Sequence, residues 1–182
     1  MQRVLVIGCS GAGKSRFSRR LAGITGLPRI ELDQAFWRPG WQPTPRAQWL
    51  ARVGELCAAP RWILDGNFHG SLHIRVPRSD TVIWLDYPRG LCIRRVFGRI
   101  LRNYGRVRNG LPAGCPEKFD LAFLRYIWNF NADHGPRLEA ALAAHGAHVR
   151  LYRLKSDSEA ERLLAELSAK SAAIQLQPPR SP

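Results

Sequence analysis

A run of eight residues near the N-terminus constrains the fold of this chain more than any other feature. Gly8-Cys9-Ser10-Gly11-Ala12-Gly13-Lys14-Ser15 matches the pattern G-x-x-x-x-G-K-S/T of a phosphate-binding P-loop. The apolar stretch Val4-Leu5-Val6-Ile7 precedes it and a helix-like stretch follows it, which is the strand–loop–helix context that the motif requires. The glycines run GxxGxG and not GxGxxG, so the run is not a dinucleotide-binding fingerprint.

Each residue type in this run has a physical role. The glycines let successive backbone N–H groups turn inward around an anion, and the N-terminus of the following helix adds its positive dipole end. Lys14 brings a positive charge to the β- and γ-phosphates, and the hydroxyl of Ser15 is a ligand for Mg²⁺. We therefore predict ATP and Mg²⁺ as cofactors. The residues predicted to bind them are Gly8, Cys9, Ser10, Gly11, Ala12, Gly13, Lys14 and Ser15.

Short apolar stretches alternate with longer helix-like ones, a pattern typical of βαβ units and a parallel sheet. The predicted strands are 3–7, 29–32, 62–64, 81–85 and 148–154. The predicted helices are 14–22, 46–58, 88–101, 118–133, 137–145 and 158–169. The pair Gly135-Pro136 separates the fourth helix from the fifth, and Ser156 with Glu159 forms a capping box before the last. The length of 182 residues favours one domain, over 1–170, and the polar, Pro-rich stretch 171–182 is predicted to be a disordered tail.

The chain is strongly basic, with a net charge of +14. Only four of its 28 basic residues are lysine, and arginine suits bidentate contact with phosphate, although a GC-rich genome would give the same bias. Charge alone leaves two partner classes open, a phosphorylated small molecule or a nucleic acid. No apolar run reaches the roughly 20 residues of a membrane span, and no signal peptide is recognisable. The four cysteines lack disulfide or zinc spacing, so we expect a cytoplasmic protein with reduced thiols.

Residues 87–116 contain no acidic residue and seven arginines. The first part has a helical pattern, and the second part, 105–116, is rich in Gly and Pro. We predict an Arg-rich helix followed by a mobile basic lid at about 104–117; the alternative is a solvated basic surface. The spacing i, i+4 places Arg95 and Arg99 on one face of that helix.

Several motifs resemble those of a known family. Trp62-Ile-Leu-Asp65-Gly66, Val82-Ile-Trp-Leu-Asp86-Tyr-Pro88 and Arg95-Val-Phe-Gly-Arg99 follow one another as in adenylate kinase-like proteins. Leu32-Asp33, Trp37-Arg-Pro-Gly-Trp41 and Asp65-Gly-Asn67-Phe resemble more closely the bacterial family of DNA topology modulation proteins, which is grouped with P-loop kinases. The resemblance covers about residues 2–155. It implies an α/β fold of the P-loop NTPase class, a three-layer α/β/α sandwich whose five-stranded parallel sheet has the order 2-3-1-4-5, with a lid.

The resemblance also implies roles for individual residues. Arg95 and Arg99 match the lid-helix arginines that embrace the ATP phosphates, and Asp65 matches an acidic residue near Mg²⁺ and its waters. Asp86 either takes part in the site or caps the helix that follows it. Where adenylate kinases have Asp-Gly-Phe-Pro-Arg, this chain has His69 in place of the arginine, so AMP is not the expected acceptor.

The acceptor site is predicted at the carboxyl edge of the sheet, where open α/β sheets bind ligands. Asp33 follows the second strand there, and a carboxylate orients and deprotonates an acceptor hydroxyl in other kinases. Trp37 and Trp41 either wall a ring-shaped substrate or anchor a loop on the core, and Arg75 is placed to meet an anionic substituent. His69 and His73 lack an acidic partner and are not expected to bind a metal.

These observations favour a kinase that transfers the γ-phosphoryl group of ATP to a nucleotide, a nucleoside or another small hydroxyl or phosphate acceptor. The predicted catalytic residues are Lys14, Asp33, Asp65, Arg95 and Arg99. The alternative is a nucleotide-regulated DNA-binding protein with weak or no kinase activity. The basic charge favours it a little, but no helix-turn-helix, zinc-finger or RNP pattern is present.

Overall fold

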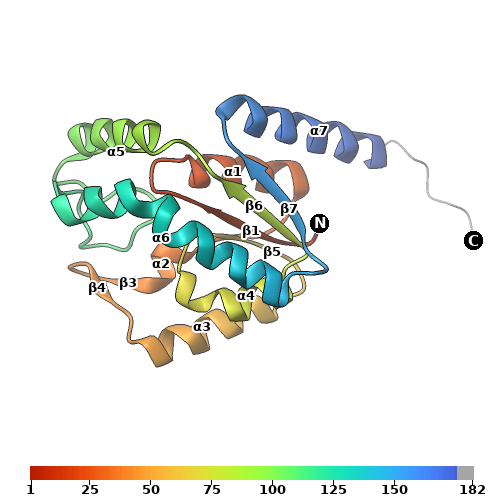
Figure 1. Cartoon of the computed structure of the whole chain (residues 1–182), viewed down its shortest axis with the longest axis horizontal. Helices are drawn as coiled ribbons and strands as arrows, with labels where there is room; N and C mark the ends of the chain where they lie inside the picture. Colours follow the sequence, from red (N-terminus) through yellow and green to blue (C-terminus); the bar gives the residue numbers. More distant parts are fainter. Residues whose placement is uncertain (176–182) are drawn as a thin grey trace, which may run out of the picture.

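A computed structural model describes residues 1–175 of the chain, and its centre is a parallel sheet (Figure 1). The strands are β1 (Arg3–Gly8), β2 (Arg29–Glu31), β5 (Trp62–Asp65), β6 (Thr81–Leu85) and β7 (Arg150–Leu154). Their order is β2-β5-β1-β6-β7, and every ladder is parallel. Because β5, β6 and β7 are the third, fourth and fifth strands of this sheet along the chain, the predicted order 2-3-1-4-5 is confirmed.

Helices cover both faces of the sheet, as predicted for a three-layer sandwich (Figure 1). Alternate residues of β1 pack in opposite directions: Val4 and Val6 belong to one core, and Leu5 and Ile7 belong to the other. The first core includes α1 (Lys14–Thr25), α5 (Arg89–Asn103) and α7 (Asp157–Gln175), and the second includes α3 (Arg46–Ala58) and α4 (Leu72–Arg78). Within the described residues, no helix has the length and apolar character needed to cross a membrane.

The prediction of two helices around Gly135-Pro136 is wrong. A single helix, α6 (Leu121–His145), runs through the pair. A proline inside a helix removes one backbone hydrogen bond and costs about 3 kcal/mol. Burial outweighs this cost, because Phe130 packs in one core, Leu138 packs in the other, and Gly135 lies against the ring of Trp84. The helix also begins later than predicted, where the carboxylate of Asp120 accepts a hydrogen bond from the N–H of Phe123 at 3.1 Å.

The segment between β2 and β6 holds short elements that the sequence did not predict. They are α2 (Leu32–Phe36), the antiparallel hairpin β3 (Trp37–Arg38) and β4 (Gln42–Pro43), the 3₁₀ turn η1 (His69–Ser71), and α4. None exceeds seven residues, which is too short for a clear hydrophobic period. These elements form one side of the site described below.

The C-terminal helix starts at the predicted capping box of Ser156 and Glu159, although one of its two hydrogen bonds has a different donor. The N–H of Glu159 donates to the hydroxyl of Ser156, whereas the carboxylate of Glu159 accepts from the N–H of Lys155 instead of Ser156. The helix continues to Gln175, so residues 171–175 of the predicted tail are helical. Residues 176–182 lie outside the described residues.

Candidate active site

The P-loop joins β1 to α1 and is fixed by its glycines and by Lys14. Gly11 and Gly13 have left-handed backbones, with φ of 87° and 90°. A Cβ at Gly11 would overlap the carbonyl oxygen of Cys92 in α5, so only glycine allows the loop and this helix to approach so closely. The ammonium of Lys14 donates to the carbonyls of Gly8 (2.8 Å) and Cys9 (3.1 Å). These two hydrogen bonds hold the charge of Lys14 next to the P-loop backbone.

The side chain of Cys9 does not take part in the phosphate-binding surface. It is buried, it donates to the carbonyl of Ile127 in α6 at 3.7 Å, and it contacts Cys92. The hydrogen bond with Cys92 and then burial raise the pKa of Cys9 well above its ordinary value, so this group stays a thiol. Cys9 therefore contributes only its backbone to the loop.

Asn67 ties the P-loop to α6. Its side-chain oxygen accepts from the N–H of Gly8 at 3.0 Å, and its side-chain nitrogen donates to the hydroxyl of Tyr126 at 3.5 Å. Burial raises the pKa of Tyr126 to about 12, so its hydroxyl stays protonated at neutral pH. Neither residue was predicted to have a role, although Asn67 lies in one of the quoted motifs.

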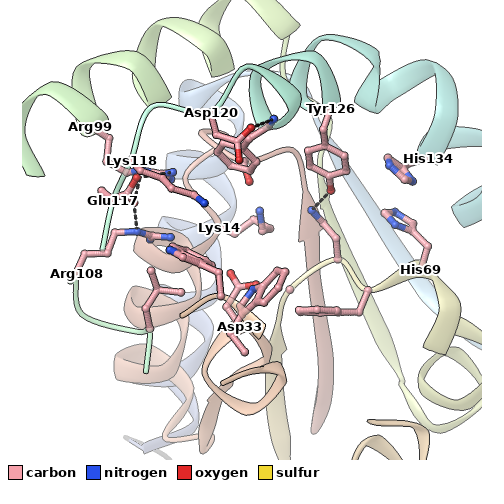
Figure 2. Close-up of a pocket in the computed structure, with 18 residues that line it drawn as sticks. Lys14, Asp33, His69, Arg99, Arg108, Glu117, Lys118, Asp120, Tyr126 and His134 are labelled. Carbon is pink, nitrogen blue, oxygen red and sulfur yellow. Dashed lines mark hydrogen bonds and ion pairs between the residues drawn. The ribbon is translucent and has the colours of Figure 1, made fainter. Parts of the chain in front are cut away.

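A cavity of about 580 Å³ opens in front of the P-loop (Figure 2). Lys14 and Ser10 line it from the loop, Asp33 lines it from α2, and Arg99 lines it from α5. The predicted residues Trp37 and Trp41 also line it, with ring centroids 5.5 Å apart in an edge-to-face arrangement. Sequence reasoning did not single out the further lining residues Phe68, Arg108, Leu111, Glu117, Lys118, Asp120, Phe123, Tyr126 and His134.

Asp33 lies in this cavity within the electrostatic influence of two cations. Burial raises the pKa of Asp33, and the charges of Lys14 and Arg108 partly oppose that rise. A carboxyl with a raised pKa is a better proton acceptor when it is ionised. Its position directly after β2 is the predicted one, at the carboxyl edge of the sheet.

The segment 104–117, predicted to be a lid, contributes Arg108, Leu111 and Glu117 to the lining of the cavity, and Glu117 ties it to α5. The carboxylate of Glu117, only 5% exposed, binds the guanidinium of Arg99 at 3.0 Å and that of Arg108 at 2.6 Å. The lid also contacts the β3–β4 hairpin, since the indole N–H of Trp41 donates to the carbonyl of Pro116 at 3.0 Å. The sequence held one indication that Glu117 pairs with the arginines of this segment, because it is the first acidic residue after the acid-free stretch.

Comparisons with known proteins bear on the fold. No family model matches the chain, and no curated protein matches it. Solved structures match over nearly the whole length. Shikimate kinase from Acinetobacter baumannii, in complex with shikimate, is 16% identical with a TM-score of 0.56, covering 97% of this chain and 96% of that one. Shikimate kinase from Bacteroides thetaiotaomicron is 17% identical with a TM-score of 0.53, covering 96% and 99%.

A third structure, a gluconokinase from Sinorhizobium meliloti 1021, is 19% identical with a TM-score of 0.50, covering 97% of this chain and 98% of that one. The chain has the fold of these kinases. The predicted P-loop α/β/α class is therefore confirmed. The closer resemblance to DNA topology modulation proteins stays a prediction.

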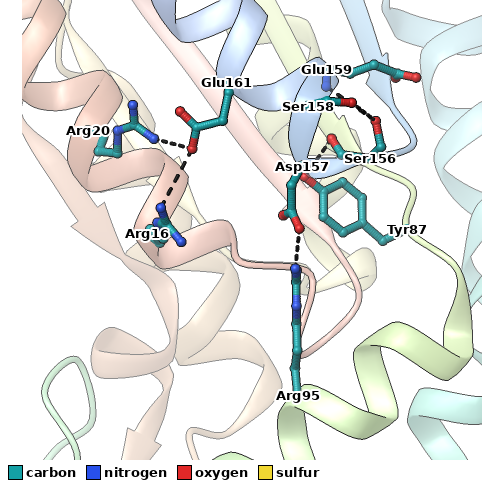
Figure 3. Close-up of polar contacts among 9 residues, drawn as sticks. All are labelled: Arg16, Arg20, Tyr87, Arg95, Ser156, Asp157, Ser158, Glu159 and Glu161. Carbon is teal, nitrogen blue, oxygen red and sulfur yellow. Dashed lines mark hydrogen bonds and ion pairs between the residues drawn. The ribbon is translucent and has the colours of Figure 1, made fainter.

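Arg95 lies away from the cavity, unlike Arg99 on the same helix. Its guanidinium pairs with Asp157 at the start of α7 (Figure 3). The helix period placed the two arginines on one face, but α5 runs between the lid and α7, so each arginine reaches a different neighbour. Among the described residues, the structure thus brings Arg99 and Arg108, rather than Arg95 and Arg99, to the cavity.

Asp65 and Asp86 are paired with protein groups. Asp65 is 4% exposed, and its carboxylate accepts from the hydroxyl of Ser18 at 2.9 Å and binds Arg29 at 3.3 Å. It does not line the cavity, and its expected place near Mg²⁺ and its waters stays a prediction. Asp86 does not cap α5; it binds Arg153 at 2.8 Å.

The structure also corrects the expectation that Arg75 contacts a substrate. Arg75 is fully buried, and its guanidinium donates to the hydroxyl of Ser71 and to the carbonyls of Gly66, Asn67 and Phe68. Burial lowers its pKa to about 10, so it stays charged at neutral pH. Arg75 therefore shapes the loop behind the cavity instead of lining it.

Two histidines stack at one end of the cavity, although they are far apart in the sequence. The rings of His69 and His134 have centroids 4.1 Å apart and an interplanar angle of 14°. Burial lowers the pKa of His69 to about 3, and the nearby charge of His134 adds to this effect. Both rings are therefore uncharged at neutral pH. Among the described residues, no group of three or more His, Cys, Asp or Glu side chains is arranged to hold a metal ion.

This pair gives a testable pH dependence. Because the pKa of His69 is lower in the folded than in the unfolded chain, the unfolded chain binds more protons between about pH 6.5 and pH 3. Stability should therefore fall as the pH falls below 6.5, by on the order of 1 kcal/mol at pH 5 after allowance for solvent screening of a partly exposed ring. Urea unfolding at pH 7 and pH 5 should show a smaller fall in the free energy of unfolding for His69→Phe than for the wild type. The same substitution at the exposed His145 should leave the wild-type pH slope, and equal slopes in both variants would contradict the assignment.

Proposed function

We propose that this protein transfers the γ-phosphoryl group of ATP to a hydroxyl group of a small molecule. One observation carries the proposal: a single cavity holds the P-loop lysine, a carboxylate at the end of β2 and an arginine of the lid helix. Lys14, Asp33 and Arg99 come from three elements far apart in the sequence, and they face the same space (Figure 2). The shared fold with shikimate kinases and a gluconokinase supports the same reaction class.

The residues of the cavity divide the reaction between them. The acceptor oxygen forms a bond to the γ-phosphorus while the bond between that phosphorus and the β–γ bridging oxygen breaks, and ADP leaves. Asp33 takes the proton of the acceptor hydroxyl. Lys14 and Arg99 stabilise the charge on the transferring group, as preorganised cations do in such reactions. The lid excludes water, so transfer to the acceptor is favoured over hydrolysis.

The P-loop fits ATP and Mg²⁺. The loop has the left-handed glycines of a phosphate cradle, and glycine at position 11 lets the loop lie directly against the carbonyl of Cys92 in α5. Ser15, in the first turn of α1 directly after the cavity residue Lys14, would bind Mg²⁺ with the phosphates. When bound, Mg²⁺ neutralises charge on the phosphate oxygens. The predicted role of Asp65 near the ion is not part of this proposal, because Asp65 is engaged with Ser18 and Arg29.

Replacing Asp33 by Asn tests the assignment of the base. The change removes the proton acceptor but keeps the shape, so we expect kcat to fall by about 10²-fold or more. The Kd for Mg-ATP, measured by calorimetry, should stay within a few-fold of the wild-type value. Asp133→Asn, at an exposed position of α6, is the matched control and should change neither quantity. Equal kcat values in Asp33→Asn and wild type would show that Asp33 is not the base.

Binding of Mg-ATP is the direct test of the proposal. A ligand present at 100 times its Kd adds about 2.7 kcal/mol to the stability of the folded state. We therefore expect a rise in Tm with Mg-ATP, and a further rise on adding an acceptor. The absence of any shift with Mg-ATP at millimolar concentration would overturn the proposed function.

A further inference from the structure

One wall of the cavity is aromatic. Trp37, Trp41 and Phe68 line it together with the stacked rings of His69 and His134. The first three rings are half-buried, so part of each surface remains open to the cavity. Their buried sides pack on further rings: Phe36 lies 4.8 Å from Trp37 and 4.7 Å from Phe68. Trp37 and Trp41 thus line the cavity while Trp37 also packs on Phe36, so the two predicted roles, substrate wall and loop anchor, are compatible.

Two of these residues adopt backbone conformations that side chains rarely take. Trp41 has φ of 61° and Phe68 has φ of 35°, and no other non-glycine residue in the described part of the chain has a positive φ. Such a conformation costs on the order of 1–3 kcal/mol and persists only where the surroundings hold it. Pro116 holds Trp41 through its indole N–H, and Arg75 and Ser71 hold the carbonyl of Phe68. The two rings are thus fixed in place at a cost in local backbone energy.

The charges of the cavity are distributed unevenly. Its cationic side chains, Lys14, Arg99, Arg108 and Lys118, belong to the P-loop or to the segment 99–118. The described lining residues between 33 and 69 include one carboxylate, Asp33, and no cation. The arginine that the sequence offered for an anionic substituent, Arg75, is fully buried and bound to backbone carbonyls. The two cations that act on Asp33 are Lys14, which the P-loop holds, and Arg108, which binds Glu117, so the aromatic wall itself offers an anionic acceptor no cation of its own.

Resting on the proposed function, we propose that the phosphoryl acceptor is an uncharged hydroxyl compound with a flat ring, of which a nucleoside is an example. The ring stacks on the wall formed by Trp37, Trp41 and Phe68, and the hydroxyl faces Asp33. Aromatic side chains bind flat rings through dispersion and quadrupole interactions that need no charge on the ligand. Nucleoside monophosphates and sugar acids need a cation at the acceptor end, and the described lining residues between 33 and 69 supply none, so we expect them to be poorer acceptors.

The test measures ADP formation from Mg-ATP with three groups of acceptors. The first group holds the five common nucleosides and pyridinemethanol, the second holds the corresponding nucleoside 5′-monophosphates, and the third is gluconate. We expect at least one member of the first group to give a kcat/KM at least tenfold above every member of the other two. A preference for a monophosphate or for gluconate would overturn the inference. So would failure of the whole first group in a protein whose Tm rises with Mg-ATP.

A variant of the wall separates stacking from structural support. Stacking of a base on an aromatic ring contributes about 1–3 kcal/mol, so Trp37→Ala should raise the KM for the active acceptor at least fivefold. The Kd for Mg-ATP should not change. Trp128→Ala, at an exposed tryptophan of α6 outside the cavity, is the matched control and should leave both values unchanged. If Trp37→Ala leaves the acceptor KM unchanged, the rings only anchor the loop and the inference is wrong. If wild-type protein does not bind Mg-ATP at all, the proposed function itself fails. That result differs from an unchanged acceptor KM in Trp37→Ala or a failure of the first acceptor group, which overturn only the inference about the acceptor.

Discussion

Replacing Lys14 by Ala is expected to lower kcat for phosphoryl transfer by about 10²–10³-fold, the usual effect of removing one preorganised charge from an active site. Lys14 is the cation of the P-loop, and its ammonium is held at the loop carbonyls of Gly8 and Cys9. The substitution removes two hydrogen bonds at a partly buried position and leaves both cores intact, so the chain should fold. The measurement is the rate of ADP formation with saturating acceptor.

The control for this change is Lys170→Ala on the exposed surface of α7, which removes the same charge at a distance from the cavity. Its kcat should equal that of the wild type. Circular dichroism and Tm of the Lys14 variant show whether the fold is retained. A folded Lys14→Ala protein with wild-type turnover would remove the P-loop from the proposed mechanism.

Replacing Arg75 by Met should give the largest loss of stability. The guanidinium donates to Ser71 Oγ at 3.0 Å, Gly66 O at 3.1 Å and Phe68 O at 2.9 Å, and also to the carbonyl of Asn67. Without it, several buried acceptors lose their donor, each at a cost of about 1–3 kcal/mol. We expect a total loss of about 3–5 kcal/mol and, for a chain of this length, a fall in Tm of roughly 10 °C or more.

Arg78→Met is the matched control, because Arg78 lies on the same short helix and is exposed. Its Tm should stay within about 2 °C of the wild type, since exposed substitutions rarely exceed 0.5 kcal/mol. Equal Tm values for the Arg75 variant and the wild type would show that the loop from Gly66 to Phe68 does not need its guanidinium. The same variant should also raise the KM for the acceptor, because Phe68 loses one of the donors to its strained backbone.

The sequence predicted those features that depend on short-range patterns. The P-loop needs glycines and a lysine at fixed spacing. Its phosphate-binding role follows from the local backbone conformation that this spacing allows. The alternation of apolar and helix-like stretches predicted the parallel sheet, because its inner strands β1, β5 and β6 bury both faces. Asp33 was found because the end of a parallel strand fixes where the next residues lie.

Features that depend on packing between distant segments were not predictable in this way. The helical period placed Arg95 and Arg99 together, but Asp157 and Glu117, which decide where the two guanidiniums go, lie 62 and 18 residues further along. The pair Gly135-Pro136 is a local signal for the end of a helix. Burial of α6 side chains in both cores outweighs that signal, and the helix continues.

The sequence by itself thus determined the sheet, the phosphate-binding loop and the carboxylate beside it, because each rests on contacts within a few residues or on the regular geometry of strands. Only the tertiary structure decided which cations face the cavity, that Arg75 is buried behind it, and that aromatic rings form one of its walls. Those outcomes depend on which side chains meet after the chain has folded, and the free energy of such contacts comes from burial and pairing that no local pattern records.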